Sequence, residues 1–396
     1  MLTDMRAPSP RIVPPARHRG LFASQAADLE RLAAEGGARR LQPRCGIDFS
    51  SNDYLALAGS PRLSRAVGEA IARGVPVGSG GSRLLRGNHP EHEALEAEAA
   101  AFFGSEAALF FSTGFAANSA LLATLPQPGD LILHDELIHA SAHEGLRLAR
   151  CGALAVAHND ANAFDQTIAG WRRTGGTGRP WIAVESLYSM DGTKAPLADL
   201  AAIAERHDAI LLIDEAHATG VFGPDGRGLA AALDGRPDVV TLKTCGKALG
   251  CEGALLCGPR IVTDFLVNRG RGFIFSTAPS PLMASAVREA LRILADEPAR
   301  RTRLAAMVAR AEHLLAPLGV RSTASPILPL VIGDPARTMA LAEALQESGF
   351  DVRGVRPPTV PEGGSRLRIS ITLNTDEAEV AALAEALAAT LAEVLP

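Results

Sequence analysis

The sequence predicts an α/β protein, with a mainly parallel sheet in a large domain and a smaller α+β domain after it. Two observations carry this prediction: short apolar runs alternate with helical patterns through the middle of the chain, and the pattern changes after about residue 295. A third is the length of 396 residues, which suits one large domain and a smaller one. We therefore expect an N-terminal segment at 1–48, a large domain at 49–294 and a small domain at 295–396.

Several short apolar runs have the length and composition of buried parallel strands. They lie at 130–134, 153–157, 181–185, 209–214, 239–242 and 253–257. Between them are segments with apolar residues at three- and four-residue spacing, which is typical of amphipathic helices. The clearest of these lie at 90–103, 139–150 and 195–207.

The C-terminal part combines strand-like stretches such as "RLRISIT" with the long helical segment "DEAEVAALAEALAATLAEVL". Leucines repeat in that segment at 383, 387 and 391. Thr375, Asp376 and Glu377 precede or open it, and short oxygens and carboxylates complement the free amides at a helix start. A compact α+β unit is therefore expected here.

Composition and charge exclude several classes of function. Hydrophobic residues make up 47% and charged residues 21% of the chain, and the net charge is -5. No arginine cluster is interleaved with aromatic residues, so we expect no nucleic-acid partner. No run approaches the roughly 18 apolar residues of a membrane span, and the Pro- and Arg-containing N-terminus lacks the apolar core of a signal peptide. We expect a cytoplasmic protein.

The five cysteines lie at positions 45, 151, 245, 251 and 257, without a CxxC pair. This spacing matches no common zinc pattern, and the chain is far longer than disulfide-stapled scaffolds. We expect reduced thiols and no metal.

Lysine is rare in this chain and therefore informative. Of the 39 Lys plus Arg residues, only Lys194, Lys243 and Lys247 are lysines. Lys247 lies in "TCGKALG", among small and apolar neighbours. A lysine in an apolar pocket can lose its proton and act as a nucleophile or base, whereas arginine stays protonated. Taken alone, an ordinary surface lysine is the simpler interpretation.

Asp214 ends the apolar run in "AILLIDEAHATG", and His217 follows three residues later. Ligands of open α/β sheets bind at the carboxyl ends of strands, so both side chains point to a site. Singly, Asp214 could be a helix or turn cap and His217 a surface histidine. Pyridoxal phosphate (PLP) requires a lysine and an acidic residue at its ring nitrogen, and Lys247 and Asp214 form such a pair.

A phosphate site is predicted where Ser112, Thr113 and Gly114 precede an apolar-periodic helix, whose first amides would face an anion. The same residues are also good structural caps. Thr244 could add a hydroxyl to the same phosphate.

His139 opens another predicted helix, with His143 one turn later. A metal pair at this spacing lacks a third ligand, so a ring stacked on the cofactor is the better functional interpretation. The glycine-rich stretch 77–90 does not match GxGxxG, and so indicates a loop lining the pocket or a flexible connection. Arg366 and Arg368 alternate in a strand pattern, which suits either a carboxylate fork or exposed edge charges.

In order along the chain, the sequence carries "FSSNDYLAL", "GSGGSR", "FSTGFAAN", "HASAHEG", "SLYSMDG", "DEAHATGVFG", "TCGKALG" and "RPPTVPEGGSRLR". In these motifs it closely resembles the α-oxoamine synthases, PLP-dependent transferases of the aspartate aminotransferase fold (fold type I). The resemblance runs from about residue 49 to the C-terminus. It is greatest to the members that join L-alanine to a pimeloyl thioester in biotin biosynthesis.

The resemblance implies a role for each matching residue around the cofactor. Lys247 would form the Schiff base and act as acid and base, and Asp214 would contact the pyridinium nitrogen. His217 and Ser189 would bind the ring hydroxyl, and His139 would stack on the ring as part of the catalytic site.

The remaining implied contacts lie at the edges of the site. At the phosphate or cofactor edge they are Gly114, Phe115 and Thr244. Arg368 would bind the amino-acid carboxylate, Asn52 would lie near the substrate and Thr359 near the acyl chain. Arg31 is the expected N-terminal arginine contact to the substrate.

The implied reaction is a decarboxylative condensation whose acyl group arrives on coenzyme A or an acyl carrier protein. The resemblance also implies a homodimer, in which residues 275–281 reach the partner's cofactor. Related enzymes that join glycine to acetyl or succinyl thioesters remain alternatives, as do transamination and β-elimination on the same fold. Regulators with this fold carry an added DNA-binding domain, for which the N-terminal segment leaves no room.

Overall fold

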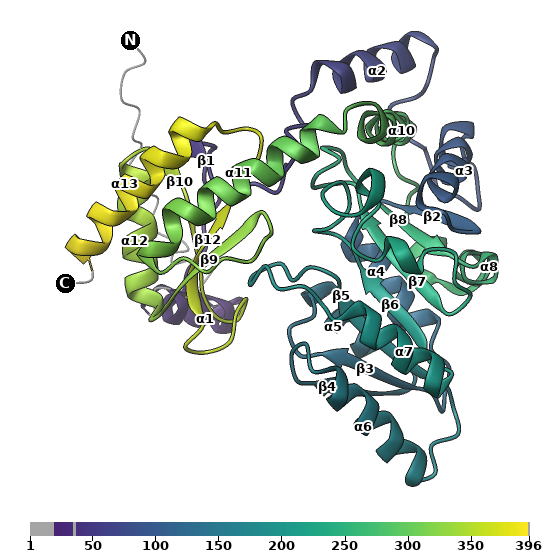
Figure 1. Ribbon diagram of the computed structural model, residues 1–396. Coiled ribbons are helices and arrows are strands. Elements are labelled where there is room, and N and C mark those ends of the chain that lie inside the picture. Colours follow the sequence, from purple (N-terminus) through teal and green to yellow (C-terminus); the bar gives the residue numbers. More distant parts are fainter. Residues whose placement is uncertain (1–19, 35–36, 395–396) are drawn as a thin grey trace.

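The structure, a computed structural model, describes residues 20–34 and 37–394 and is built around a seven-stranded sheet (Figure 1). The strand order is β2-β8-β7-β6-β5-β3-β4, and β8 runs antiparallel to both of its neighbours. The other neighbouring pairs are parallel, which confirms the predicted sheet. The strands are β2 (Ala107–Phe111), β3 (Leu131–Asp135), β4 (Gly152–Val156), β5 (Pro180–Glu185), β6 (Ile210–Asp214), β7 (Val239–Thr244) and β8 (Ala254–Gly258).

Helices cover both faces of this sheet, which explains why its central strands are apolar throughout. Successive residues of β6 face opposite layers: Leu212 packs in one apolar cluster, and Leu211 and Ile213 pack in another. The Leu212 side is covered by α4 (Gly114–Thr124), α5 (Ala140–Leu148), α8 (Arg260–Arg269) and α9 (Arg271–Ile274). The opposite side is covered by α6 (Ala161–Arg173) and α7 (Leu197–His207).

A third group of helices lies near β2 and β8. Both α2 (Pro61–Ala72) and α3 (Pro90–Phe103) pack against α10 (Pro281–Asp296). Short 3₁₀ turns occur at η2 (Pro224–Gly226), η3 (Ala231–Leu233) and η4 (Ala316–Leu318).

The C-terminal part forms a separate antiparallel sheet in the order β11-β12-β9 (Figure 1). Its strands are β9 (Ile327–Gly333), β11 (Arg353–Val355) and β12 (Ser365–Ser370), and β1 (Ile47–Asp48) pairs with β10 (Phe350–Asp351) beside it. The helices here are α1 (Ala23–Ala34), α11 (Ala299–Leu315), α12 (Pro335–Glu347) and α13 (Glu377–Val394). One apolar cluster joins Phe110 of the large sheet to Leu328 and Leu367 of the small one, so the two parts share a continuous core.

The start of α13 shows the expected capping chemistry. The Asp376 carboxylate accepts the amide of Glu379 at 2.9 Å, and the Glu379 carboxylate accepts the amide of Asp376 at 2.9 Å. These reciprocal bonds satisfy two amides that a helix start leaves free. The capped start predicted from this stretch is confirmed, and Asp376 supplies it.

The predicted strands and helices of the large domain are all present, with ends shifted by at most two residues. Strand β2 was missed, although it leads directly into the predicted phosphate motif. The division at 1–48, 49–294 and 295–396 stays a prediction. None of the helices in the described residues is both long and apolar enough to cross a membrane.

His92 on α3 makes stability depend on pH. It is buried and its Nε2 lies 2.8 Å from the Pro279 carbonyl oxygen, and burial together with the nearby Arg83 lowers its pKa to about 4. The unfolded chain protonates this histidine near pH 6.5, so the unfolded state binds more protons between about pH 6.5 and 4. Stability contributed by neutral His92 is therefore lost as the pH falls through this window. Between pH 7 and 5 the expected loss is about 2 kcal/mol of unfolding free energy, measured by urea titration.

The matched variant is His92→Gln, which cannot titrate. Its unfolding free energy should change less between pH 7 and 5 than that of the parent chain, by about the same 2 kcal/mol. Equal changes in the two proteins would contradict the assigned pKa.

Candidate active site

Asp214 is the last residue of β6, at the edge where the parallel strands end. Its side chain is 9% exposed, with Oδ1 accepting the Ala216 amide at 2.8 Å and Oδ2 accepting the Asn118 side-chain amide at 2.6 Å. These two bonds fix the orientation of the carboxylate. A buried carboxylate held in this way is suited to face a cationic ring nitrogen.

Lys247 lies in the turn that follows β7. Two backbone bonds close this turn: Gly250 N donates to the Lys247 carbonyl and Cys251 N donates to the Cys245 carbonyl, both at 2.9 Å. Gly250 has φ +63°, and a Cβ there would lie 2.3 Å from the Ala58 amide nitrogen, so only glycine allows this close approach. The turn therefore holds Lys247 in a fixed position beside the strand ends.

Burial lowers the pKa of Lys247 below its ordinary value, and the charge of Arg368 acts in the same direction, while Asp214 and Glu185 oppose the shift. A lowered pKa makes the neutral amine more available as nucleophile and base. This is the direction expected for a lysine in an apolar pocket.

The start of α4 forms a cradle of the kind that binds phosphate. Thr113 caps the helix by accepting the Ala116 amide at 3.0 Å, and the amides of Gly114 and Phe115 have no acceptor among the described residues. A Cβ on Gly114 would lie 3.4 Å from the Thr244 hydroxyl oxygen. Because glycine has no Cβ, the space between the start of α4 and Thr244 stays open. Free amides at a helix start attract an anion.

His139 connects to Asp214 through two side chains that sequence reasoning missed. Its Nδ1 lies 2.8 Å from the Ser141 hydroxyl, which accepts the Asn118 amide at 3.0 Å. The same Asn118 amide contacts Asp214. Burial lowers the pKa of His139, with Asp214 opposing and Lys247 adding to the shift, so its ring is favoured in the neutral form.

His217 belongs to a second chain of polar contacts. Its Nδ1 lies 2.7 Å from the Tyr54 hydroxyl, which donates to Asn52 Oδ1 at 3.2 Å. Arg368 donates to the same Asn52 oxygen at 2.9 Å. Burial, reinforced by the positive charges of Lys247 and Arg368, lowers the pKa of His217 well below its ordinary value. His217 is therefore neutral near pH 7 and can hydrogen-bond without adding charge.

Arg368 and Arg366 lie on the same strand, β12, but have different environments. Arg366 forms an ion pair with Asp191, whereas no carboxylate of the described residues lies within ion-pair distance of Arg368. Arg368 is 7% exposed and donates to the Ser189 carbonyl at 2.6 Å and the Ser370 hydroxyl at 2.7 Å. A buried guanidinium without an anionic partner is suited to a substrate carboxylate. This geometry supports the choice of Arg368 over Arg366.

Glu185 is a further residue of the cofactor region that the sequence analysis did not predict. It ends β5 directly beside Asp214 in the sheet register, is buried, and its Oε1 has no hydrogen-bond partner among the described residues. Burial and the nearby Asp214 charge raise its pKa well above the ordinary value, against the pull of Lys247. The strand-end rule that selected Asp214 applies equally to Glu185 and could have found it.

A cavity of about 450 Å³ adjoins these groups. Three segments line it: residues 136–140 with His143, residues 188–191, and residues 358–361. The predicted His139, Ser189 and Thr359 therefore meet around one space. His143 itself packs edge-on against His134, with ring centroids 5.4 Å apart, and no group of three metal-ligating side chains occurs among the described residues.

The substrate contact expected of Arg31 stays a prediction. Arg31 lies on α1, its side chain is 59% exposed and pairs with Asp28 one turn earlier, and it is not among the residues that line this cavity. Arg39 instead donates to the Thr359 hydroxyl at 3.4 Å. The sequence analysis named Arg31 alone, in the N-terminal segment, which lies outside the part of the chain that carries the family motifs.

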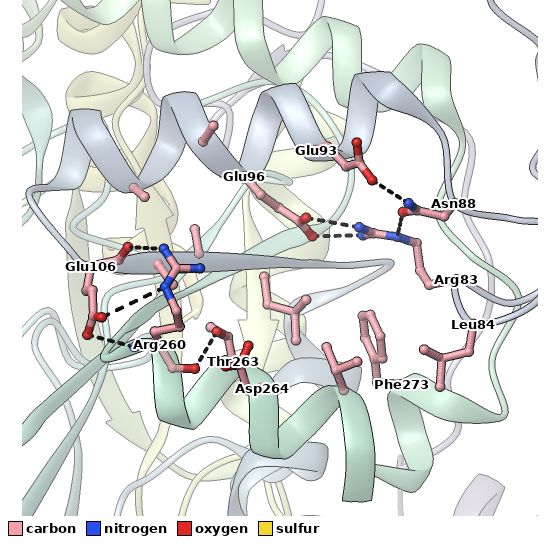
Figure 2. A pocket seen from close by; sticks show the side chains of 16 residues that line it. Arg83, Leu84, Asn88, Glu93, Glu96, Glu106, Arg260, Thr263, Asp264 and Phe273 are labelled. Atoms are coloured by element: carbon pink, nitrogen blue, oxygen red, sulfur yellow. Dashed lines mark hydrogen bonds and ion pairs between the residues drawn. The ribbon is translucent and has the colours of Figure 1, made fainter.

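A second pocket, of about 600 Å³, lies between α3 and α8 (Figure 2). Arg83 in this pocket forms two hydrogen bonds to Glu96 at 2.8 and 2.9 Å, and Asn88 joins Arg83 to Glu93 (Figure 2). None of the predicted site residues lines it. The candidate site is therefore the strand-end region and not this pocket.

The residues present fit bound PLP. The open cradle beside Gly114 suits the phosphate, Asp214 the ring nitrogen and Lys247 the aldehyde carbon, and Glu185 leaves a buried polar atom facing no protein partner. Fold and site together define a fold type I, PLP-dependent enzyme. The family model for class I and II aminotransferases matches residues 45–387.

Sequence similarity to characterised families shows which group of PLP-dependent enzymes this chain resembles. An 8-amino-7-oxononanoate synthase of Anaeromyxobacter dehalogenans strain 2CP-1 is 42% identical over 394 residues, covering 96% of this chain and 98% of the relative. The chain belongs to the 8-amino-7-oxononanoate synthase family of PLP-dependent acyltransferases.

Two solved structures share the fold. Serine palmitoyltransferase from S. paucimobilis with PLP and myriocin bound has a TM-score of 0.86 at 25% identity, covering 95% of this chain and 98% of that one. The 8-amino-7-oxononanoate synthase of Francisella tularensis has a TM-score of 0.73 at 26% identity, covering 88% and 98%. Both confirm the predicted fold type I architecture, and the first supports the predicted cofactor.

Proposed function

We propose that this enzyme condenses L-alanine with a pimeloyl thioester, with loss of carbon dioxide, to give 8-amino-7-oxononanoate for biotin biosynthesis. One observation carries the proposal: Arg368 is buried, has no carboxylate partner among the described residues, and lies near enough to Lys247 for its charge to lower the pKa of that lysine, on which the Asp214 charge also acts. The names of the relatives give the product, 8-amino-7-oxononanoate, and the resemblance in the sequence motifs implies the two substrates. We further propose a cytoplasmic setting, which the five free cysteines support.

The surroundings of Arg368 and of Lys247 suit each side chain to one step of this reaction. Arg368 binds the alanine carboxylate, oriented by the Ser189 carbonyl and Asn52. When bound, PLP supplies a sink for the electron pair left at the amino-acid Cα. Lys247, with its lowered pKa, takes the Cα proton and later returns a proton to the product.

The other side chains hold this arrangement. Asp214, oriented by Asn118, would face the ring nitrogen, His139 would lie over the ring, and His217 and Ser189 would hydrogen-bond the ring hydroxyl. Thr359 lines the cavity that would take the acyl chain. Gly114, Phe115 and Thr244 would hold the phosphate.

We also propose a homodimer. Ser79 and Ser280 tie the loop after α2 to the segment before α10 through bonds of 2.5 and 2.6 Å to the carbonyls of Pro279 and Val77. Large apolar side chains on and beside these segments are exposed, including Val77 at 75%, Leu85 at 84% and Phe275 at 72%. Such a group is typical of a surface that another chain covers.

A panel of substrates tests the assignment. Purified holoenzyme is incubated with L-alanine or glycine and with pimeloyl, acetyl or succinyl thioesters on coenzyme A, and with pimeloyl acyl carrier protein. Release of free thiol and the condensed product are measured. We expect L-alanine with a pimeloyl thioester to exceed every other pair by at least about tenfold in kcat/KM, since one methyl group can discriminate at that level.

Turnover of glycine with succinyl-CoA, with none of alanine and a pimeloyl thioester, would assign the protein to another α-oxoamine synthase reaction. Formation of a keto acid or ammonia without a thioester would indicate transamination or elimination. The two pimeloyl carriers compared side by side identify the acyl donor.

A further inference from the structure

Three side chains behind the substrate cavity form a continuous hydrogen-bonded chain that the predicted site does not include. Asp135 ends β3 and is fully buried, and its Oδ1 lies 2.9 Å from His158 Nδ1. His158 Nε2 lies 2.9 Å from the Thr193 hydroxyl. The three residues come from segments that are far apart in sequence but adjacent at the carboxyl edge of the sheet.

The charge state of the chain follows from Asp135. Burial alone would raise its pKa, but the hydrogen bonds from His158 and from the amides of Asn159 and Leu137 outweigh burial and lower it below the ordinary value. An ionised carboxylate can only accept, so His158 Nδ1 donates to it. In the neutral imidazole Nε2 is then the acceptor for the Thr193 hydroxyl. The bond from Nδ1 to Asp135 thus orients the ring so that Nε2 faces the Thr193 hydroxyl.

Asp135 also anchors the segment that leads to His139. Its carboxylate accepts the Leu137 amide at 2.8 Å and the Asn159 amide at 2.8 Å. The Glu136 side chain in turn accepts the His158 amide at 3.0 Å. The wall of the cavity formed by residues 136–140 is therefore held by the same carboxylate that holds His158.

Thr193 belongs to a short hairpin, residues 187–194, that carries Ser189 at its tip. Tyr188 N donates to the Thr193 carbonyl and Gly192 N donates to the Tyr188 carbonyl, both at 2.9 Å. The Ser189 carbonyl accepts Arg368 Nε at 2.6 Å. The hairpin is thus held by His158 on one side and orients Arg368 on the other.

The ring of His158 packs edge-on against Tyr188, with centroids 4.5 Å apart. Asp135, His158 and Thr193 do not line the cavity, whereas their neighbours Ser189 and Tyr188 do. The chain therefore lies one layer behind the reacting groups, where it can position the wall but cannot contact the substrate.

We propose that Asp135, His158 and Thr193 are positioning residues that hold the Ser189 hairpin in the register that orients Arg368 for the amino-acid carboxylate. This inference rests on the proposed role of Arg368 in binding that carboxylate. Loosening the hairpin should weaken binding of the amino acid more than it slows the chemical step, because Lys247 and Asp214 are held by other contacts.

The test compares Thr193→Val with Thr193→Ser in the holoenzyme. Valine keeps the shape but cannot hydrogen-bond to His158, and one lost hydrogen bond corresponds to about a three- to tenfold effect. We expect Thr193→Val to raise KM for L-alanine about three- to tenfold, with kcat within about twofold of the parent. Thr193→Ser should keep the parent KM, because it keeps the hydroxyl. Binding of L-alanine alone, followed by the change in cofactor absorbance, should weaken by the same factor.

His158 offers a second pair of variants. His158→Gln can still reach Thr193 and His158→Asn can still reach Asp135, so each keeps one link of the chain. Each is expected to raise KM for L-alanine as Thr193→Val does. The control is His207→Asn, because His207 forms a similar contact to Asp165 at 2.7 Å between α6 and α7, away from the cavity.

The outcomes separate this inference from the function on which it rests. Arg368→Ala is measured in parallel and should raise KM for L-alanine by more than any of these variants. If Arg368→Ala raises KM but Thr193→Val matches Thr193→Ser, the positioning role is wrong while the proposed function stands. If the Thr193 and His207 variants change KM equally, the effect is general and the proposal is also overturned. If Arg368→Ala leaves KM unchanged, the carboxylate site itself is wrong.

Discussion

Replacing Lys247 by alanine should abolish both the visible absorbance of lysine-bound PLP and the condensation. The amine is the covalent partner of the cofactor in the proposed site, whereas Lys243, near the end of β7, is paired with Glu215. Loss of a general acid and base alone costs about 10²- to 10⁴-fold in kcat, and the covalent contribution adds to this. The measurements are an absorbance spectrum after reconstitution with PLP and a single-turnover thiol-release assay.

Lys194→Ala is the matched control for this experiment. Lys194 donates to the Ala324 carbonyl at 3.0 Å and lies over the Phe222 ring, away from the cofactor groups. Its variant should keep the absorbance band and the turnover. A band that persists in the Lys247 variant, or disappears in the Lys194 variant, would show that the wrong lysine has been assigned.

Replacing Lys243 by methionine should destabilise the fold by about 3–5 kcal/mol without removing a catalytic group. Lys243 and Glu215 are both 0% exposed, and their Nζ and Oε2 atoms lie 2.7 Å apart. Lys243 also donates to the Arg227 carbonyl at 2.8 Å and lies 4.9 Å from the centroid of the Phe103 ring. Removing the ammonium leaves a buried carboxylate without its cation. Urea titration monitored by circular dichroism measures the loss.

The double variant Lys243→Met, Glu215→Gln tests the cause. Glutamine is neutral and still offers an oxygen to the Ala230 amide, which Glu215 now accepts at 3.0 Å. The double variant should therefore be more stable than Lys243→Met alone. If the losses of unfolding free energy from Lys243→Met and Glu215→Gln simply add in the double variant, the ion pair is not the source of the destabilisation.

Lys243 shows what the sequence could and could not predict. Its position in "VVTLKT" fits a strand, and all six residues of β7 are buried. A buried lysine in this strand is explained by its bond to Glu215, which lies 28 residues earlier in the chain. The sequence singled out Lys243 with Lys194 and Lys247 for their rarity. It could not show that Lys243 is committed to an ion pair while Lys247 is not.

The same limit applies to the cofactor region. Asp214 was predicted because a carboxylate at the end of an apolar strand is a local signal. Asn118, which orients that carboxylate, lies 96 residues away, and no pattern in "FSTGFAANSALL" separates it from a solvent-facing residue of the helix. Tyr54 and Ser141 were missed for the same reason. Residues that contact the reacting groups are visible as motifs, whereas residues that orient them become visible only when distant segments meet.

The most direct test of the account is to locate the lysine that carries PLP. The holoenzyme is reduced with borohydride, digested, and analysed by mass spectrometry for a peptide bearing the cofactor mass. We expect the mass on the peptide that contains Lys247 and on no other. Attachment at Lys194 or Lys243, or no attachment to any lysine, would contradict it.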